Sequence, residues 1–159
     1  INIQRSGITN TIITLQHGKR FHGFNFDKIL VDAPCSGTGT IRKSLKTVNI
    51  WNPGMITKLA RQQSELLHNS FENLKKGGEL VYSTCSVEPE ENEGVIHRFL
   101  EAYPNAKVVK VKLPGLKVAP VITEFLGVKY NKQVKKTLRI WPQDNDTEGF
   151  FVAKIKKSA

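Results

Sequence analysis

The chain has 159 residues, a length that is enough for one domain with a buried core. Hydrophobic residues make up 39% of it, and no apolar run approaches the roughly 20 residues of a membrane-spanning helix, so composition excludes an integral membrane protein and predicts a soluble one. Lys and Arg number 24 against 14 Asp and Glu, and the resulting net charge of +10 argues against a partner that is itself strongly basic.

The chain begins with a short predicted helix and a predicted strand. Residues 1–10 have the pattern of a helix end closed by Gly7, and residues 11–16 are rich in the β-branched side chains typical of strands. Residues 17–20 (His-Gly-Lys-Arg) would then form the loop that leaves this strand.

A second predicted strand, residues 27–32, leads directly into polar chemistry. Its apolar run at residues 29–31 is typical of a strand covered on both faces of a parallel sheet. Pro34 follows and has no amide hydrogen to continue a strand ladder. Gly37 and Gly39 allow the backbone to turn sharply and to approach a ligand closely.

The second cysteine of the chain ends a similar unit. Residues 79–84 predict another buried strand, and Cys85 follows it as Cys35 follows residues 27–32. In open parallel sheets, ligands bind outside the carboxyl ends of the strands. We therefore expect Asp32, Cys35 and Cys85 to lie at one edge of the sheet and to share one site.

The cysteines have three other interpretations: buried structural residues, a disulfide and a metal site. A lone free cysteine is usually a small buried hydrophobe, but two of them after two strands favour a site. A disulfide has little support, because the sequence shows neither a signal peptide nor a cysteine framework, which also favours a cytoplasmic location. A metal site is not expected, because there is no C-x-x-C pair and the four histidines are scattered.

Residues 55–74 predict a long helix with one apolar face. Gln63 lies within this face, where a buried amide needs partners, so we expect it to brace the loop after Cys35 or to lie partly wet at the edge of the face. The apolar positions are Ile56, Leu59, Ala60, Leu67, Phe71 and Leu74.

A further helix is predicted to start near Glu88 and to stop at Pro104. Its expected first turn is crowded with carboxylates, which the helix dipole favours. We interpret them as a helix start and not as a catalytic cluster. They are Glu88, Glu90, Glu91 and Glu93.

The last third of the chain is the most basic. Residues 106–112 predict a strand, residues 113–136 an irregular insertion, and residues 137–141 and 149–157 a final strand pair. Residues 105–159 carry 12 basic and 4 acidic groups, a net charge of +8. Such an excess indicates a polyanion such as nucleic acid, or else a solvated lysine-rich surface, with equal weight.

The motifs around the two cysteines closely resemble those of the Sun-type (Nol–Nop–Sun) RNA cytosine-5 methyltransferases, and the resemblance extends over nearly the whole chain. It implies an α/β fold with a Rossmann-like S-adenosylmethionine-dependent methyltransferase sheet, mostly parallel with an antiparallel final strand. The matching positions are residues 32–37 (Asp-Ala-Pro-Cys-Ser-Gly), 82–86 (Tyr-Ser-Thr-Cys-Ser) and 88–93 (Glu-Pro-Glu-Glu-Asn-Glu), with Arg139, Pro142 and residues 149–151.

The resemblance also implies a role for each residue of the candidate site. Cys85 would be the nucleophile that attacks carbon 6 of cytosine. Cys35 would assist removal of the carbon 5 proton and release of the enzyme, and Asp32 would contact the ring at nitrogen 3. A helix starting near Glu88 could lower the pKa of the Cys85 thiol, although the glutamates there would oppose this effect.

The implied cofactor is S-adenosylmethionine, with Asp32 and Pro34 as part of its site. Where the family often has an aspartate that contacts the adenine, this chain has His17, a loop histidine that is more often merely exposed. The family's glycine-rich loop, Asp-x-x-Ala-Ala-Pro-Gly-Gly-Lys-Thr, is absent. We therefore expect residues 1–159 to be the C-terminal portion of one catalytic domain whose N-terminal strands and glycine loop lie upstream.

The implied substrate is RNA, either transfer or ribosomal, bound in part by Arg42, Lys43 and Arg139, and the protein is expected to be a monomer without metal or membrane partner. Two alternatives remain open. One is a non-catalytic RNA-binding module. The other is a DNA cytosine methyltransferase, in which the cysteine after proline, here Cys35, would attack.

Overall fold

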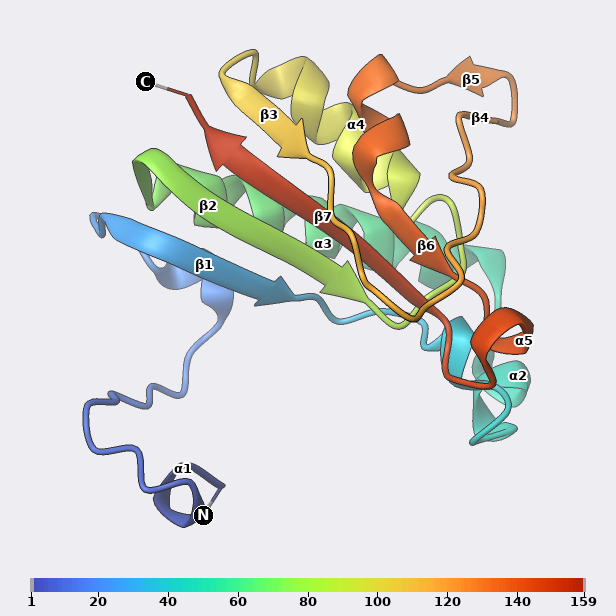
Figure 1. Cartoon of the computed structure of the whole chain (residues 1–159), viewed down its shortest axis with the longest axis horizontal. Helices are drawn as coiled ribbons and strands as arrows, with labels where there is room; N and C mark the ends of the chain where they lie inside the picture. The colour runs from blue at the N-terminus through green and yellow to red at the C-terminus, as the bar shows by residue number, and fades with distance from the viewer. Residues whose placement is uncertain (1, 159) are drawn as a thin grey trace.

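The computed structural model describes residues 2–158, which form a mixed sheet with helices on one face (Figure 1). The sheet has five strands. Four of them follow the order β1-β2-β7-β3, and β6 pairs with the first residues of β7. Strand β1 pairs parallel with β2, whereas β7 is antiparallel to β2, β3 and β6. The strands are β1 (Phe26–Asp32), β2 (Leu74–Thr84), β3 (Ala106–Val109), β6 (Leu138–Ile140) and β7 (Phe150–Lys157).

The expected antiparallel final strand is confirmed, but the sheet is less parallel than expected. Strand β7 alone runs against the others, and it lies inside the sheet between β2 and β3. An interior reversed strand makes every pairing around it antiparallel, so only the β1–β2 pair is parallel. The expected final pair, residues 137–141 with 149–157, is the β6–β7 pair.

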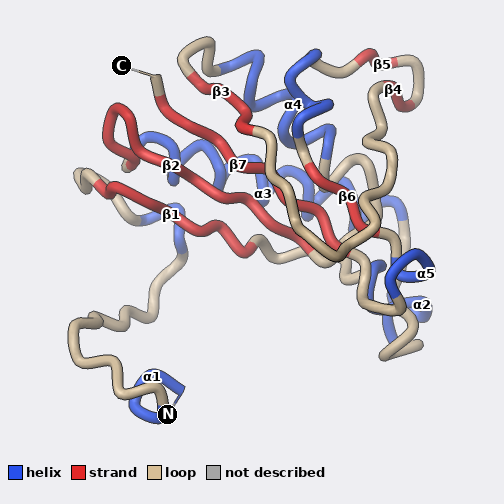
Figure 2. Tube along the Cα trace, viewed as in Figure 1, coloured by secondary structure: helices blue, strands red, loops and turns tan. Residues whose placement is uncertain are grey.

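Two long helices cover one face of the sheet, as Figure 2 shows. Helix α3 (Pro53–Glu72) begins where the side chain of Asn52 accepts a hydrogen bond from the amide of Met55 at 2.8 Å, with proline in the first turn. Helix α4 (Glu93–Ala102) packs beside it. The remaining elements are short: α1 (Asn2–Arg5), η1 (Gly18–Arg20), η2 (Thr38–Thr40), α2 (Lys46–Ile50), β4 (Glu124–Phe125), β5 (Val128–Lys129), η3 (Lys132–Lys136) and α5 (Pro142–Asn145).

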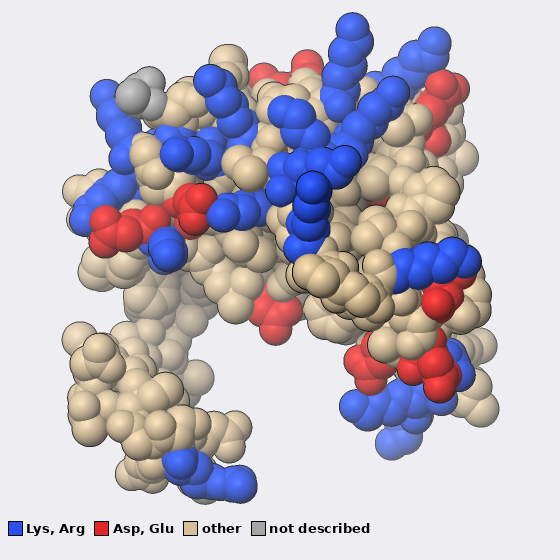
Figure 3. Space-filling view, viewed as in Figure 1, with Lys and Arg blue, Asp and Glu red and all other residues tan. Residues whose placement is uncertain are grey.

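The opposite face of the sheet is open and carries lysines. Successive residues of a strand point to opposite faces, and Val108 and Ile155 point toward the helices, so their neighbours Lys107 and Lys156 lie side by side on the open face. Lysine and arginine side chains gather on this face over β3 and β7 (Figure 3). Part of the basic excess of the last third therefore lies on this face (Figure 3).

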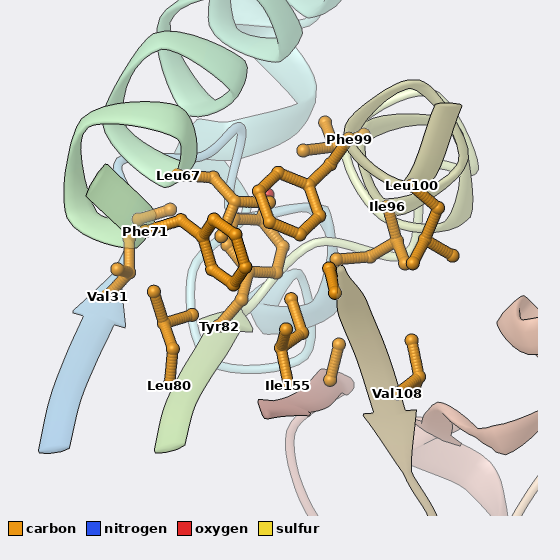
Figure 4. Close-up of a cluster of buried hydrophobic side chains, with 14 of the residues drawn as sticks. Val31, Leu67, Phe71, Leu80, Tyr82, Ile96, Phe99, Leu100, Val108 and Ile155 are labelled. Carbon is orange, nitrogen blue, oxygen red and sulfur yellow. The ribbon is translucent and has the colours of Figure 1, made fainter. Parts of the chain in front are cut away.

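The core lies between the open sheet's inner face and the two helices (Figure 4). Phe71 of α3 and Phe99 of α4 meet edge to face, with ring centroids 5.0 Å apart and planes at 86°. Leu80 and Ile155 pair across β2 and β7 beneath them and are completely buried. Each such side chain stabilises the fold by roughly 1.5–3 kcal/mol on burial.

The predicted strand at residues 11–16 is not formed. These residues are coil, and Ile12 and Leu15 are 91% and 105% exposed. Strand preference is mostly the gain from packing against neighbouring strands, and nothing in the described chain lies alongside this segment. The short helix before it ends at Arg5 with Gly7 in the left-handed conformation at φ 65°, as expected, although Ile1 lies outside the described residues.

The helix expected from Glu88 begins only at Glu93. The intervening residues form a turn whose side chains fold inward, and Glu91 and Glu93 are completely buried. The helix-start interpretation thus holds for Glu93 alone, and the buried carboxylates of Glu91 and Glu93 also accept hydrogen bonds from distant parts of the chain. The strand expected at 106–112 is shorter, ending at Val109, and the irregular insertion after it contains the small β4–β5 hairpin.

No helix among residues 2–158 is both long and apolar enough to cross a membrane.

Candidate active site

The structure brings the two cysteines together at the carboxyl edge of β1 and β2. Asp32 lies opposite Ser83 in the parallel pair, so the two strands end at the same level. The Sγ atoms of Cys35 and Cys85 are 3.2 Å apart, in contact but not bonded, and both residues are half-buried. Two thiols separated by 50 positions in sequence thus face one another.

Gly39 makes this close approach possible. Its amide donates to the carbonyl of Cys85 at 2.9 Å, and its carbonyl accepts from the amide of Gly149 at 2.8 Å. A Cβ at this position would lie 2.7 Å from the Cys85 carbonyl oxygen and 2.5 Å from that of Gly149. The glycine therefore serves contact between three backbone segments, and not the approach of a ligand as the sequence suggested.

Behind the cysteines lies a buried polar cluster centred on Glu91. The Gln63 amide donates to the Pro34 carbonyl at 2.9 Å and to Glu91 Oε1 at 2.8 Å, so Gln63 is a buried brace as expected, but it holds the residue before Cys35 and not the loop after it. Ser36 and Ser86, the residues that follow the two cysteines, both donate hydroxyls to Glu91 Oε2. Glu91 was missed from sequence, although the buried Gln63 and the repeated Cys-Ser pair were signals of a shared acceptor.

Burial raises the pKa of the Cys35 thiol to about 12, and its hydrogen bond with Cys85 adds to this effect. The two thiols share one hydrogen bond, in which either sulfur can be the donor. The helix expected to activate Cys85 is not there, because α4 begins at Glu93.

Asp32 is exposed beside the cysteines at the outer edge of the sheet. Its Oδ1 accepts a hydrogen bond from the Ser83 hydroxyl at 3.3 Å. Strand β1 pairs only with β2 among the described residues, so the edge next to Asp32 is free. Cavities of 270–590 Å³ lie elsewhere on the described chain, and their linings do not include Asp32, Pro34 or either cysteine.

The expected cofactor contact His17 lies away from this edge. It caps η1, whose Gly18 carbonyl accepts a hydrogen bond from Asn69 near the end of α3. That end of α3 leads into the start of β2, whereas Asp32 stands at the end of β1. His17 therefore fits the interpretation of an exposed loop histidine, and it lies apart from the two cysteines.

Arg42 and Lys43 lie on the surface near the same edge. Arg42 pairs with Asp146 at 2.6 Å, and Lys43 pairs with Glu148 at 3.2 Å. Both basic side chains are more than half exposed, and such pairs contribute little free energy. They are available to exchange these partners for phosphates.

Arg139, by contrast, is buried and committed to the fold. Its side chain is 1% exposed and forms a bidentate ion pair with Glu93, at 2.9 and 2.5 Å, while also donating to the Val87 carbonyl at 2.7 Å. A guanidinium held in this way cannot reach RNA. The sequence could not reveal this, because the matching carboxylate was interpreted as part of an exposed helix start.

No group of three or more His, Cys, Asp or Glu side chains within residues 2–158 has the geometry to hold a metal ion. The chemistry available at the carboxyl edge is therefore that of two thiols and a neighbouring carboxylate.

The chain is a mixed α/β protein with two thiols at the carboxyl edge of its parallel strand pair, and comparison with known proteins places it more narrowly. Residues 1–156 match the family model described as 16S rRNA methyltransferase RsmB/F, and the chain belongs to that family. It is 46% identical over 158 residues to tRNA (cytosine(49)-C(5))-methyltransferase of Pyrococcus abyssi, covering 98% of this chain and 50% of that protein.

A second relative and a solved structure are also similar to this chain over nearly its whole length. Ribosomal RNA small subunit methyltransferase F of Shewanella amazonensis is 42% identical, over 99% of this chain and 32% of its own length. The crystal structure of NSun6 from Pyrococcus horikoshii with SFG superposes with a TM-score of 0.78 and 30% identity, over 99% of this chain and 37% of its own. The chain thus spans between about a third and a half of these relatives.

Proposed function

We propose that this chain carries the two catalytic cysteines of an S-adenosylmethionine-dependent RNA cytosine-5 methyltransferase. The observation that carries the proposal is the 3.2 Å contact between Cys35 and Cys85 at the carboxyl edge of the sheet. Membership of the RsmB/F family and the names of the relatives, which act on tRNA or ribosomal RNA, support it.

The chemistry calls for two thiols with different roles. Carbon 5 of cytosine is a poor nucleophile, and addition of the Cys85 thiolate to carbon 6 turns it into an enamine-like carbon. S-adenosylmethionine would supply the methyl group to that carbon. Cys35, once its own proton has passed to water, would take the carbon 5 proton; the electron pair of that bond restores the ring double bond while the carbon 6–sulfur bond breaks and releases the Cys85 thiolate.

The raised pKa of Cys35 suits this role. A thiol with a pKa of about 12 gives a strongly basic thiolate, which is what removal of the carbon 5 proton needs. Asp32, exposed beside the pair, would bind the ring at nitrogen 3 and stabilise charge that develops during attack. The target base must leave its stack to reach this edge.

The described residues form one wall of a cofactor site. Asp32 and the backbone at Pro34 stand at the free edge of β1, and both residues are exposed. A cofactor fits there only if further chain covers that edge. We propose that the part of the protein corresponding to the unmatched length of the relatives provides this cover and the glycine-rich loop.

RNA would approach over the lysine-rich part of the open face. A cavity of about 590 Å³ is lined by Lys110, Lys112 and Lys135, and none of these has an acidic partner within 4.0 Å among residues 2–158. Leu138, which also lines it, is joined to Asp32 through the register Asp32–Ser83–Val152–Leu138. Three strand spacings separate the groove from the site, about 14 Å.

The roles of the cysteines are tested in a chimera that joins this chain to the segment of the Pyrococcus abyssi relative that it does not match. With tRNA and ribosomal RNA substrates and S-adenosylmethionine, Cys85→Ala is expected to abolish methyl transfer and the covalent RNA adduct. Cys35→Ala is expected to abolish turnover but to accumulate the adduct. Reversed phenotypes would show that the roles are exchanged, as in the DNA-type mechanism.

RNA binding by the chain alone is a separate test. Replacing Lys110, Lys112 and Lys135 by glutamine is expected to weaken binding and to reduce the slope of log affinity against log salt by about 2, at roughly 0.7 per lost phosphate contact. Lys154, which is paired with Glu79 at 2.8 Å, is the control. Equal effects at all four lysines would point to a diffuse surface and not a groove.

A further inference from the structure

We infer that Glu91 is a positioning residue, which holds the thiols of Cys35 and Cys85 in contact by binding the serine that follows each of them. Glu91 is completely buried, and its two oxygens accept four hydrogen bonds from the loops around the cysteines and from α3. The geometric part of this inference is independent of function, while its consequence for methyl transfer rests on the proposed function.

The two carboxylate oxygens have different partners. Oε1 accepts from the Ser36 amide at 3.0 Å and from Gln63 Nε2 at 2.8 Å, which are obligatory donors. Oε2 accepts from the hydroxyls of Ser36 and Ser86, the latter at 2.5 Å, and the two hydroxyl oxygens are themselves 3.1 Å apart. One oxygen atom thus connects the residue after Cys35 with the residue after Cys85.

Glu91 is itself fixed from behind. The Tyr82 hydroxyl, on the inner face of β2, donates to the Glu91 carbonyl at 2.6 Å. The next residue, Asn92, donates to the Ser86 carbonyl at 2.9 Å and accepts from the Thr84 hydroxyl at 2.6 Å. The carboxylate is therefore a rigid post between the two loops, and both loops bend around it.

No Lys or Arg lies within 4.0 Å of the Glu91 carboxylate in the described part of the chain. Hydrogen bonds alone compensate its burial, and a buried carboxylate without them is very unfavourable. Removing Glu91 leaves the Ser36 amide and one N–H of the Gln63 amide without an acceptor, while the other stays on the Pro34 carbonyl, so the cysteine loops must rearrange to rehydrate the two orphaned groups.

Glutamine at position 91 is a discriminating replacement. Its oxygen can accept from the two obligatory donors, and its amide can donate to the serine hydroxyls, which reverse direction freely. Glu91→Gln therefore keeps the geometry and removes the charge, whereas Glu91→Ala removes both. A positioning role predicts rescue by glutamine.

The test measures how well the thiols are placed, on the chain itself and without RNA or cofactor. The chain is equilibrated with glutathione: the dithiol is oxidised to the Cys35–Cys85 disulfide while one glutathione disulfide is reduced to two glutathione thiols. The equilibrium ratio gives the effective concentration of one thiol at the other, which reports positioning directly. Intact mass counts the oxidised fraction.

Glu91→Ala is expected to lower this effective concentration at least about tenfold, because a displacement of the order of 1 Å is enough to lose such preorganisation. Glu91→Gln is expected to stay within about threefold of the parent chain. Ile155→Ala, a cavity in the core away from the cysteine loops, controls for lost stability and is expected to leave the value unchanged.

An unchanged value in Glu91→Ala, or a loss in Glu91→Gln equal to that in Glu91→Ala, would overturn the inference. If Glu91→Ala does not fold, the double replacement Ser36→Ala and Ser86→Ala decides, because it removes both hydroxyl ties and leaves the backbone contacts. In the chimera, the same defect is expected in kcat and not in KM. Failure of methyl transfer in every protein, with the glutathione result intact, would contradict the proposed function alone.

Discussion

The loops that follow β1 and β2 differ sharply from the segment that precedes β1. At the carboxyl edge, the loops after β1 and β2 are tied by Gly39, Gln63 and Glu91, with their polar groups buried and paired. Before β1, residues 8–15 include several large apolar side chains, yet these side chains are exposed and have no packing partner among the described residues. Apolar and β-branched residues form a strand only when a partner is present, whereas a dense set of reciprocal hydrogen bonds fixes a loop.

The largest effect in this comparison is expected from breaking the buried ion pair beside the cysteine loops. Arg139→Met leaves the Glu93 carboxylate buried without its partner, and the expected loss is about 3–5 kcal/mol in the free energy of unfolding. Urea unfolding measures it. The partly exposed Lys154 of the Lys154–Glu79 pair is the control, with a loss below about 1 kcal/mol for Lys154→Met. Similar losses for the two would contradict a structural role for Arg139.

A smaller effect is expected from separating the loops. Gly39→Ala places a methyl group 2.5 Å from a backbone oxygen, and overpacking of this kind costs roughly 1–3 kcal/mol. The Sγ–Sγ contact should open at the same time, with a lower disulfide yield under glutathione. Gly54→Ala in the first turn of α3, whose nearest neighbour is the movable Asn52 side chain at 3.3 Å, should cost little. A fully stable Gly39→Ala chain would disprove the tight approach.

The raised pKa of Cys35 predicts a pH dependence at the same edge. The folded chain holds this proton up to about pH 12, and the unfolded chain releases it near 9. The contribution is therefore fully present below pH 9 and is lost as pH rises from 9 to 12, by at most about 1 kcal/mol per pH unit. Cys35→Ser should flatten the difference between unfolding at pH 8 and at pH 10. Parallel curves for both chains would contradict the burial of this thiol.

The smallest effect is expected in the amino-terminal segment. Replacing Ile13 and Leu15 by lysine should change the free energy of unfolding by no more than about 0.5 kcal/mol, since both side chains are exposed. In the chimera, where we propose that residues 11–16 gain neighbouring strands, the same pair should destabilise by more than about 2 kcal/mol, because buried charge is costly. An unchanged free energy of unfolding in both the chain and the chimera would mean that the segment forms no strand in either protein.

Sequence reasoning succeeded where local pattern and tertiary environment agree. Strand β1, helix α3 and the β6–β7 pair lie close to their expected ranges, and β2 ends where expected but begins at Leu74, five residues before the predicted start. Gln63 is buried and braces the chain next to Cys35, although at Pro34 before it and not in the loop after it. The meeting of the two thiols followed from the rule that parallel strands share a carboxyl edge. The roles assigned to Cys85, Cys35 and Asp32 remain predictions.

The failures arose where a long-range partner decides. Glu91 and Glu93 match a helix start locally, but Ser36 and Arg139 lie 55 and 46 residues away from them in sequence and draw them inward. Arg139 was expected to bind RNA because its distant partner Glu93 could not be foreseen. Residues 11–16 failed in the opposite sense, because their strand pattern needs a neighbour that is absent from the described chain.

The most direct measurement maps the cysteine that bonds to RNA. The chimera is incubated with S-adenosylmethionine and an RNA whose target cytosine carries fluorine at carbon 5, which blocks proton removal and so holds the adduct. Nuclease and protease digestion followed by mass spectrometry then locates the nucleotide. A cytosine on the peptide that contains Cys85, and none on Cys35, is the predicted result. A nucleotide on Cys35, or on neither cysteine of an active enzyme, would contradict the account.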